Sequence, residues 1–275
     1  MRIALLQLNA CDDPAANLPV TLKLVDEAVA DGAEFVLTPE VTNCVSTSRS
    51  QQMNVLSHQD EDPTLAALRD AAAKHSIWLL IGSLGLKTDD PDGRFANRSF
   101  LVDPQGDIAA LYDKIHMFDV QISESESYRE SAGYRPGDRA VVADAGFAKV
   151  GLTICYDMRF PKLYRDLAQA GAQIITVPAA FSPVTGPAHW ESLLRARAIE
   201  TGCFVIAPAQ TGEHKATKGK SRSTHGHSLV VSPWGEVILD AGTDPGMVCT
   251  DIDLGDVARA RQRVPSLTHD RPYTL

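Results

Sequence analysis

The sequence lacks long apolar runs and has no excess of basic charge. No stretch approaches the roughly 20 apolar residues of a transmembrane helix, and Met1 to Asn9 is too short and too regular for a signal peptide. The formal net charge is -9, whereas nucleic acids and anionic membranes attract basic patches. We therefore expect a cytoplasmic protein whose partners include neither nucleic acid nor a membrane.

Paired cysteines and metal-binding motifs are also missing. The five cysteines are odd in number and stand far apart, at positions 11, 44, 155, 203 and 249, which argues against a disulfide framework or a CxxC metal clamp. Three histidines, His214, His225 and His227, fit no standard zinc spacing with the cysteines. We expect reduced thiols, no metal and no cofactor.

What the sequence does contain is a repeated alternation of apolar runs and amphipathic helical patterns. It occurs once over residues 1–112 and again over 148–253, and it is typical of an α/β protein. Each half alone has too few helices to cover both faces of a sheet. A single domain over residues 1–275, with two sheets and helices on the outer faces, explains the pattern best.

The patterns assign positions to individual elements. Strands are predicted at Arg2–Asn9, Ala33–Thr38, Ile77–Leu84, Val150–Ile154, Ala172–Pro178, Cys203–Ala209 and Met247–Asp253, and helices at Asn17–Asp31, Asp62–His75, Lys162–Gly171 and Ala188–Thr201. Hairpins are predicted for Phe95–Val102 with Ile108–Tyr112 and for His227–Ser232 with Glu236–Asp240. Three segments show no period: Val41–Glu61, Ile115–Asp138 and Glu213–His225. We expect the second to be a functional loop and the third a mobile loop over a cleft entrance.

Cys155 stands where the predicted strand Val150–Ile154 ends and before the next helix begins. Open α/β sheets place their sites at the carboxyl ends of strands, and a nearby helix N-terminus favours the thiolate form of cysteine. Cys155 is therefore a candidate nucleophile. The alternative is a small core residue, since free cysteine is among the most buried residue types.

Three charged residues could complete a site around Cys155. Glu40 also follows a strand and could take the thiol proton. Lys114, after a third strand, could stabilise a tetrahedral oxyanion together with the backbone N–H of Tyr156. Glu130 lies in the segment between them and Cys155. Taken singly, these residues could instead be a solvated strand end, a surface charge and a loop acid paired with a neighbouring arginine.

Four short motifs together resemble those of the nitrilase superfamily of carbon-nitrogen hydrolases. Pro39–Glu40 is similar to the glutamate motif of that family, Asp113–His116 to its lysine motif and Cys155–Pro161 to its cysteine motif, in the same order and at similar separations. Arg129–Ser131 resembles the segment that contributes a second glutamate, Glu130, which positions the lysine and the substrate. The resemblance implies a four-layer α-β-β-α sandwich, a cysteine on a nucleophile elbow, and a homodimer or higher homo-oligomer.

Within the family, the segments Thr185–Glu191 and Leu194–Glu200 are similar to the Nit branch. Ala209–His214 and Gly226–Ser228, followed by Pro233–Gly235, look more like deaminated glutathione amidases than ω-amidases. The resemblance implies hydrolysis of a small carboxylate-bearing amide to acid and ammonia through a cysteine thioester, with deaminated glutathione as the first candidate substrate. An ω-amidase acting on α-ketoglutaramate and an N-carbamoyl amino acid amidohydrolase are the alternatives.

Substrate binding is assigned to Tyr156, Arg159, Ala180, Thr185 and His189. Arg159 is the expected cation for a substrate carboxylate, because it follows the elbow directly. It could equally pair with Asp157 or Glu191 and order the turn, since arginines near active sites often do both. The sequence departs from the family pattern at Thr38, where a hydrophobic residue is more usual, and over Val41–Arg49. A catalytically silent scaffold remains a competing hypothesis, although a scaffold needs no catalytic set.

Overall fold

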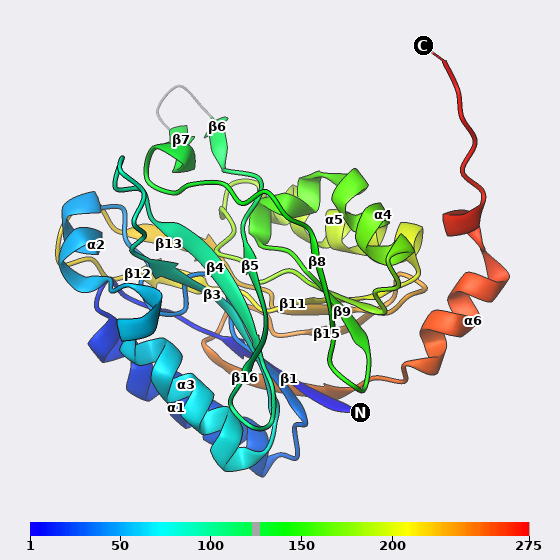
Figure 1. Cartoon of the computed structure of the whole chain (residues 1–275), viewed down its shortest axis with the longest axis horizontal. Helices are drawn as coiled ribbons and strands as arrows, with labels where there is room; N and C mark the ends of the chain where they lie inside the picture. The colour runs from blue at the N-terminus through cyan, green and yellow to red at the C-terminus, as the bar shows by residue number, and fades with distance from the viewer. Residues whose placement is uncertain (123–126, 275) are drawn as a thin grey trace.

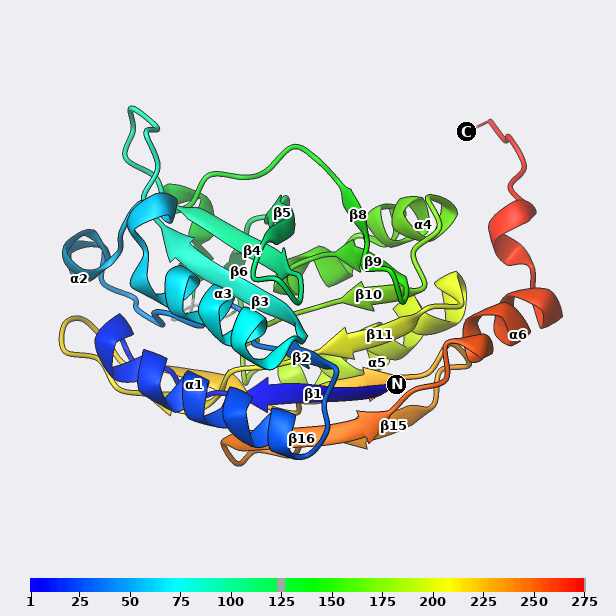
Figure 2. The same ribbon diagram turned by 60° about the horizontal axis from the view of Figure 1, so that its bottom comes forward.

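Two six-stranded sheets lie face to face, with helices on the outer face of each (Figure 1, Figure 2). The computed structural model describes residues 1–122 and 127–274. The first sheet has the strand order β16 (Gly246–Asp251), β1 (Arg2–Gln7), β2 (Phe35–Leu37), β3 (Trp78–Leu86), β4 (Ala96–Val102), β5 (Ile108–Asp113). The second has the order β15 (Val237–Asp240), β14 (Leu229–Val231), β11 (Phe204–Ala207), β10 (Ile174–Thr176), β9 (Lys149–Leu152), β8 (Val141–Asp144).

The outer layers are two pairs of helices. The helices α1 (Pro14–Ala30) and α3 (Pro63–His75) pack on the first sheet, and α4 (Pro161–Gln169) and α5 (Gly186–Thr201) pack on the second. The predicted four-layer α-β-β-α sandwich is thus confirmed. The helix α6 (Gly255–Arg263) follows β16 and lies at the end of the sandwich opposite α2 (Arg49–Val55) (Figure 1).

The apolar run of β1 is explained by burial on both of its faces. Ile3 and Leu5 belong to the large core between the sheets, whereas Ala4 and Leu6 pack in the layer under α1 and α3. All four side chains are fully buried. A strand covered on both sides needs apolar residues at every position, which is why this strand is readable from the sequence.

The parallel strands point their carboxyl ends to the same edge of each sheet. β1, β2 and β3 are parallel neighbours in the first sheet, and β9, β10 and β11 are parallel neighbours in the second. Side chains that follow β2 and β9 can therefore meet where the two sheets face each other.

Close backbone packing fixes the chain just before Glu40. A Cβ added at Gly82, in β3, would lie 2.0 Å from the carbonyl oxygen of Thr38 and 2.5 Å from that of Pro39. Only glycine permits this approach. The hydroxyl of Thr38 accepts hydrogen bonds from the Gly82 amide at 3.0 Å and from the Thr42 hydroxyl at 2.7 Å. The unusual threonine therefore anchors the turn that carries Glu40.

Several predicted boundaries differ from the structure near helix starts. α1 begins at Pro14, before the predicted Asn17, because the Asp13 side chain caps it by accepting from the Ala15 amide at 3.0 Å. α2 lies inside the segment Val41–Glu61, which was predicted to be irregular, and Ser48 caps it through the Gln51 amide. A short polar helix has too few turns to show an apolar period.

The two other aperiodic segments also contain strands. β6 (Asp119–Gln121) pairs with β7 (Ser127–Arg129) inside the predicted functional loop. The prediction that Glu213–His225 is one loop is wrong, because β12 (Thr211–His214) and β13 (Arg222–His225) form an antiparallel hairpin. Its buried His214 bonds to the Ala10 carbonyl and the Thr224 hydroxyl, each at 2.7 Å. Polar side chains hold this hairpin, so its sequence carries no apolar signal.

Two negative findings concern the described residues only. No helix among them is long and apolar enough to cross a membrane. No group of three or more His, Cys, Asp or Glu side chains in residues 1–122 and 127–274 is arranged to hold a metal ion.

Candidate active site

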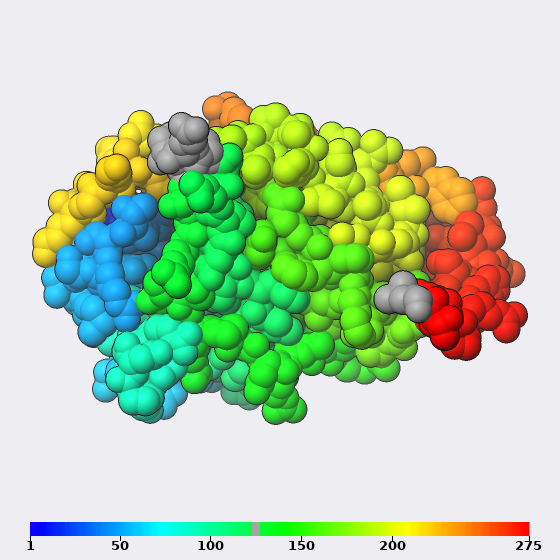
Figure 3. Space-filling view, turned by 90° about the horizontal axis from the view of Figure 1, so that it is seen from above, coloured from blue at the N-terminus to red at the C-terminus, as the bar shows by residue number. Residues whose placement is uncertain are grey.

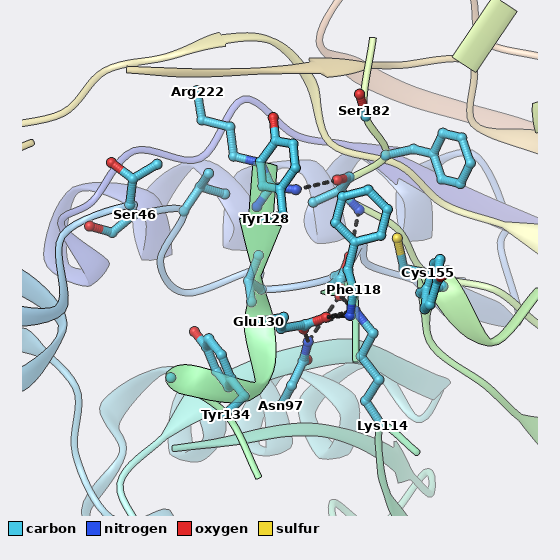
Figure 4. A pocket seen from close by; sticks show the side chains of 18 of the residues that line it. Ser46, Asn97, Lys114, Phe118, Tyr128, Glu130, Tyr134, Cys155, Ser182 and Arg222 are labelled. Carbon is cyan, nitrogen blue, oxygen red and sulfur yellow. Dashed lines mark hydrogen bonds and ion pairs between the residues drawn. The ribbon is translucent and has the colours of Figure 1, made fainter. Parts of the chain in front are cut away.

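A cavity of about 360 Å³ lies at the carboxyl ends of the parallel strands. The structure brings all four residues that were predicted to be catalytic to its wall: Glu40, Lys114, Glu130 and Cys155 (Figure 4). Glu40 follows β2 of the first sheet, and Cys155 follows β9 of the second. The cavity is therefore built at the junction of the two sheets.

Segments that are far apart in the sequence surround this cavity on one face of the molecule. Figure 3 shows the blue segment near residue 50, the green segment near residue 130 and the yellow segment near residue 220 on that face. The hydroxyl of Thr47 donates to the carbonyl of Lys220 at 2.8 Å, and Arg49 donates to the carbonyl of Gly133 at 3.0 Å. These bonds tie the three segments into one rim.

Glu40 is 3% exposed and both of its carboxylate oxygens accept hydrogen bonds. Oε1 lies 2.8 Å from Nζ of Lys114 and 2.9 Å from Nδ2 of Asn97, and Oε2 lies 2.8 Å from the Ala180 amide nitrogen. Burial alone would raise the pKa of Glu40, but the positive charge of Lys114 and its hydrogen bond hold that pKa below the usual value. Glu40 is therefore ionised at neutral pH.

Lys114 is 2% exposed and lies between two carboxylates. Its Nζ is 2.9 Å from each carboxylate oxygen of Glu130, in addition to its contact with Glu40. Burial alone would lower the pKa of Lys114, but the charges of Glu130 and Glu40 raise it well above the usual value. The amide of Phe118 donates to Glu130 at 2.6 Å and fixes that carboxylate in turn.

Cys155 occupies a strained backbone position at the start of the short 3-10 turn Cys155–Arg159. Its φ is +47°, a region that residues other than glycine seldom adopt. Such a conformation costs about 1–3 kcal/mol and persists only where the surroundings fix it. Here the Cys155 amide donates to the Pro178 carbonyl at 2.9 Å. This is the geometry of a nucleophile elbow, as the family resemblance implied.

The buried carboxylate of Asp157 fastens the elbow to the segment that carries Lys114. It accepts hydrogen bonds from the Ile154 amide at 2.8 Å, from the Tyr112 hydroxyl at 2.6 Å and from the His116 amide at 3.0 Å. Asp157 is fully buried. The strands β5 and β9 belong to different sheets, so this one side chain helps to set the relative positions of Lys114 and Cys155.

The resting form of Cys155 differs from the sequence prediction. A helix N-terminus was expected to favour the thiolate, but burial and the negative charge of Glu40 raise the pKa of Cys155 well above its usual value, although Lys114 lowers it. The helix α4 begins only at Pro161, so its N-terminus does not outweigh burial and the charge of Glu40. Cys155 therefore rests as a thiol beside an ionised carboxylate.

The predicted substrate-binding residues divide into two groups. Tyr156, Ala180 and Thr185 line the cavity. Arg159 and His189 lie outside its lining and contact each other, with Nη2 of Arg159 3.2 Å from Nδ1 of His189. Arg159 also lies over the rings of Tyr156 and Phe181, at 5.8 and 5.6 Å. It pairs with neither of the carboxylates that were its predicted alternative partners, since Asp157 bonds to His116 and Glu191 to Arg195.

Asn97 and Arg222 are two polar residues of the cavity wall that were not predicted from the sequence. Asn97, in β4, donates through Nδ2 to Glu40 at 2.9 Å and to Glu130 at 3.4 Å. The local pattern does not single it out, because Asn97 is followed in β4 by two more polar residues, Arg98 and Ser99. Arg222, in β13, reaches the cavity from the hairpin that was predicted to be a loop. No local pattern distinguishes it from the neighbouring basic residues.

Comparison with known proteins places these features in a family. Residues 2–262 match the carbon-nitrogen hydrolase family. The chain belongs to that family. This carbon-nitrogen hydrolase is 39% identical over 273 residues to a deaminated glutathione amidase from Yersinia enterocolitica, a match that covers 98% of this chain and 92% of the relative.

Solved structures agree with the assignment. The hydrolase is similar to the Caenorhabditis elegans NitFhit protein, with a TM-score of 0.89 and 34% identity, over 98% of this chain but only 65% of that chain. It is also similar to Saccharomyces cerevisiae Nit3, a member of branch 10 of the nitrilase superfamily, with a TM-score of 0.86 and 29% identity over 99% of this chain and 97% of that one. The resemblance to the nitrilase superfamily and its Nit branch is confirmed.

Proposed function

We propose that this hydrolase is an amidase that cleaves a small carboxylate-bearing amide through a thioester on Cys155, with deaminated glutathione as its substrate. The observation that carries the proposal is the placement of a buried thiol beside an ionised Glu40 that is held by Lys114. The relative from Yersinia enterocolitica, named deaminated glutathione amidase, supports this choice of substrate.

In the first step Glu40 takes the proton from the Cys155 thiol while the sulfur attacks the amide carbonyl carbon. Glu40 and Glu130 already place two negative charges around one lysine, so a free thiolate would add a third. Direct transfer to Glu40 moves a negative charge from oxygen to sulfur without adding one. Attack and proton transfer are therefore coupled, and the charge passes on to the carbonyl oxygen. Lys114 and the Tyr156 amide stabilise that oxyanion.

In the second step the proton on Glu40 passes to the leaving nitrogen, the C–N bond breaks and the thioester remains. A water molecule then gives a proton to Glu40 and attacks the thioester carbonyl. The C–S bond breaks, and the sulfur regains its proton from Glu40. Glu130 keeps Lys114 in place throughout. Each cycle consumes one water and returns the site to its resting charge.

The leaving amine depends on the substrate. A primary amide releases ammonia, as the sequence analysis expected. Deaminated glutathione carries its cleavable amide between an oxo-acid and cysteinylglycine, so cysteinylglycine leaves in place of ammonia. An assay therefore has to follow the acid product together with both amines.

Substitution of the nucleophile tests the mechanism. Cys155→Ala should lower the turnover of deaminated glutathione at least about 10³-fold, as loss of a nucleophile does in other covalent hydrolases, without loss of folded structure by circular dichroism. Cys249→Ala is the matched control, since this thiol lies on β16 outside the cavity lining. Turnover by the Cys155→Ala protein at the wild-type rate would exclude the mechanism.

A substrate panel tests the acyl group. Deaminated glutathione, α-ketoglutaramate and N-carbamoyl amino acids should be compared by kcat/KM, and we expect deaminated glutathione to give the highest value. A preference for α-ketoglutaramate or for an N-carbamoyl amino acid would assign the protein to one of the alternative activities. No turnover of any amide, together with a Cys155 that iodoacetamide does not modify, would favour the scaffold hypothesis.

Assembly and location are part of the same proposal. We expect a homodimer or larger homo-oligomer in the cytoplasm, as the family resemblance and the sequence analysis imply. Light scattering on the purified protein measures the first, and cell fractionation the second. A monomer across micromolar concentrations would contradict the expected assembly.

A further inference from the structure

Arg222 is joined to the catalytic carboxylate through a single residue. Its Nη2 donates to the carbonyl oxygen of Ala180 at 2.6 Å, and the amide of Ala180 donates to Oε2 of Glu40 at 2.8 Å. The hairpin β12–β13 holds the arginine there, and Thr47 closes against the same hairpin through Lys220. Arg222 is therefore a fixed part of the cavity wall.

Arg222 forms no direct ion pair with any carboxylate of the described residues. Lys114, by contrast, pairs directly with both Glu40 and Glu130. The single bond of Arg222 to a carbonyl uses one of the five N–H donors of a guanidinium. Arg129, the other arginine of the lining, is exposed. The remaining donors of Arg222 are the ones available to an anionic ligand.

We propose that Arg222 binds a carboxylate of the amide substrate and so determines which amides the enzyme accepts. This inference rests on the proposed amidase function. A guanidinium matches a carboxylate with two parallel N–H···O bonds, which give orientation as well as affinity. Figure 4 shows Arg222 and Cys155 on different parts of the wall, so a carboxylate at Arg222 is held apart from the amide at the thiol.

Arg159 was the expected carboxylate-binding residue because it follows the elbow directly, but the structure favours Arg222. Arg159 is absent from the cavity lining, lies over the rings of Tyr156 and Phe181, and contacts His189. The two arginines are therefore a matched pair for testing the inference. Each carries the same charge, and only one of them faces the cavity.

A second effect of Arg222 must be separated from substrate binding. Its positive charge helps to lower the pKa of Glu40, after the larger effects of burial and of Lys114. Loss of Arg222 therefore also alters the catalytic base. That change affects every substrate equally, whereas loss of carboxylate binding affects only substrates that carry the carboxylate. The ratio of kcat/KM values for charged and neutral substrates isolates the second effect.

The experiment compares wild type, Arg222→Gln, Arg222→Lys and Arg159→Gln. The substrates are deaminated glutathione and two analogues, one with the oxo-acid carboxylate as its methyl ester and one with the glycine carboxylate as its amide. The wild type should disfavour one analogue by roughly 10- to 100-fold in kcat/KM, the usual effect of losing a charge-assisted bond, and that analogue identifies the carboxylate that Arg222 binds. Arg222→Gln should lose this discrimination through KM, Arg222→Lys should retain part of it, and Arg159→Gln should retain all of it.

Discrimination that survives in Arg222→Gln, or that disappears in Arg159→Gln instead, would overturn the inference, as would a wild type indifferent to both analogues. Calorimetric binding of 2-oxoglutarate, the acid product, to Cys155→Ala protein with and without Arg222→Gln gives a readout independent of turnover. Loss of binding with Arg222→Gln supports the inference even if no amide is cleaved. Equal binding combined with normal turnover leaves the proposed function standing and the inference wrong.

Discussion

Nζ of Lys114 lies 2.8 Å from Oε1 of Glu40, and both side chains are almost completely buried. Neither charge is screened by solvent, so each strongly favours the ionised form of the other. The pKa of Glu40 is lowered and that of Lys114 is raised. In the proposed mechanism, this relationship keeps Glu40 able to accept a proton and Lys114 able to stabilise an oxyanion.

The first prediction concerns the pH dependence of kcat/KM. Activity requires ionised Glu40, whose pKa lies below its usual value, so the acid limb should fall only below about pH 4.5. Because Cys155 reacts from its thiol form and its pKa is raised, we expect no rise near about pH 8.5, where an ordinary thiol ionises. Initial rates between about pH 3 and about pH 10 cover both the acid limb and the region where an ordinary thiol ionises. A rise in kcat/KM with a midpoint near 8.5 would show that a free thiolate is the reacting species.

The second prediction concerns stability. Lys114→Met leaves the buried Glu40 and the partly buried Glu130 without their lysine and should lower the free energy of unfolding by about 3–5 kcal/mol, the usual effect of breaking a buried pair. Glu40→Gln keeps the side-chain shape and leaves Lys114 paired with Glu130. This variant should therefore lose less free energy of unfolding than Lys114→Met does. Urea unfolding followed by tryptophan fluorescence measures the difference. Lys23→Met, in an exposed pair with Glu27, is the control and should be nearly neutral.

The sign of the pH effect on stability follows from the same shifts. The folded pKa of Glu40 is lowered, so its contribution is present above the unfolded carboxyl pKa and is lost as the pH falls through the folded value. The stability difference between wild type and Glu40→Gln should therefore shrink in acid. A difference that grows as the pH is lowered would contradict the assigned ionisation.

The third prediction concerns Asn97, whose Nδ2 donates to both Glu40 and Glu130. Asn97→Asp would place a third carboxylate beside these two, and like charges raise the pKa of each other. The acid limb of kcat/KM should therefore move to higher pH. The same pH series measures it, with Ser99→Ala on the same strand as control, since the Ser99 hydroxyl bonds to the Ile81 carbonyl. Lower activity with an unmoved acid limb would mean that Asn97 has only a packing role.

The contrast between Cys155 and Arg222 shows how far the sequence could predict the site. Cys155, Glu40 and Lys114 each follow an apolar strand, and strands buried on both faces are visible in a single sequence. Their convergence requires that β2 and β5 of the first sheet and β9 of the second sheet end at the junction of the two sheets. Arg222 reaches the cavity through the register of a polar hairpin, and that register depends on bonds from His214 to Ala10 and Thr224. Contacts between residues so far apart in the chain produce no periodic pattern in the sequence.

The ionisation of Cys155 could not be predicted for a related reason. The sequence places a helix soon after the thiol. The distance from the thiol to the first turn of that helix, and the position of Glu40 near the sulfur, depend on the tertiary structure. Burial and the charge of Glu40 raise the pKa of Cys155 by more than Lys114 lowers it. Local sequence indicates which residue is the nucleophile, whereas the resting charge of that residue is decided by neighbours from other strands.

The last prediction concerns Thr185, which precedes α5 and lines the cavity. A threonine at this position normally caps its helix by accepting a backbone N–H. Here the side chain makes no cap bond, and its buried Oγ1 has no partner among the described residues. A hydroxyl that is buried without a bond costs free energy in the folded state, so we infer that it serves the bound substrate. Thr185→Val should leave the free energy of unfolding nearly unchanged or slightly higher and should raise KM by roughly 3- to 10-fold, consistent with one neutral hydrogen bond.

Thr201→Val is the matched control at the other end of the same helix. The Thr201 hydroxyl donates to the Arg197 carbonyl at 2.7 Å and accepts from the Cys203 amide at 3.3 Å, so its loss should destabilise the protein by about 1–3 kcal/mol. Thr201 is absent from the cavity lining, so KM should not change. Urea unfolding and steady-state kinetics on both variants separate the two roles. If Thr185→Val is destabilised like Thr201→Val while its KM is unchanged, the Thr185 hydroxyl supports the fold and does not bind the substrate.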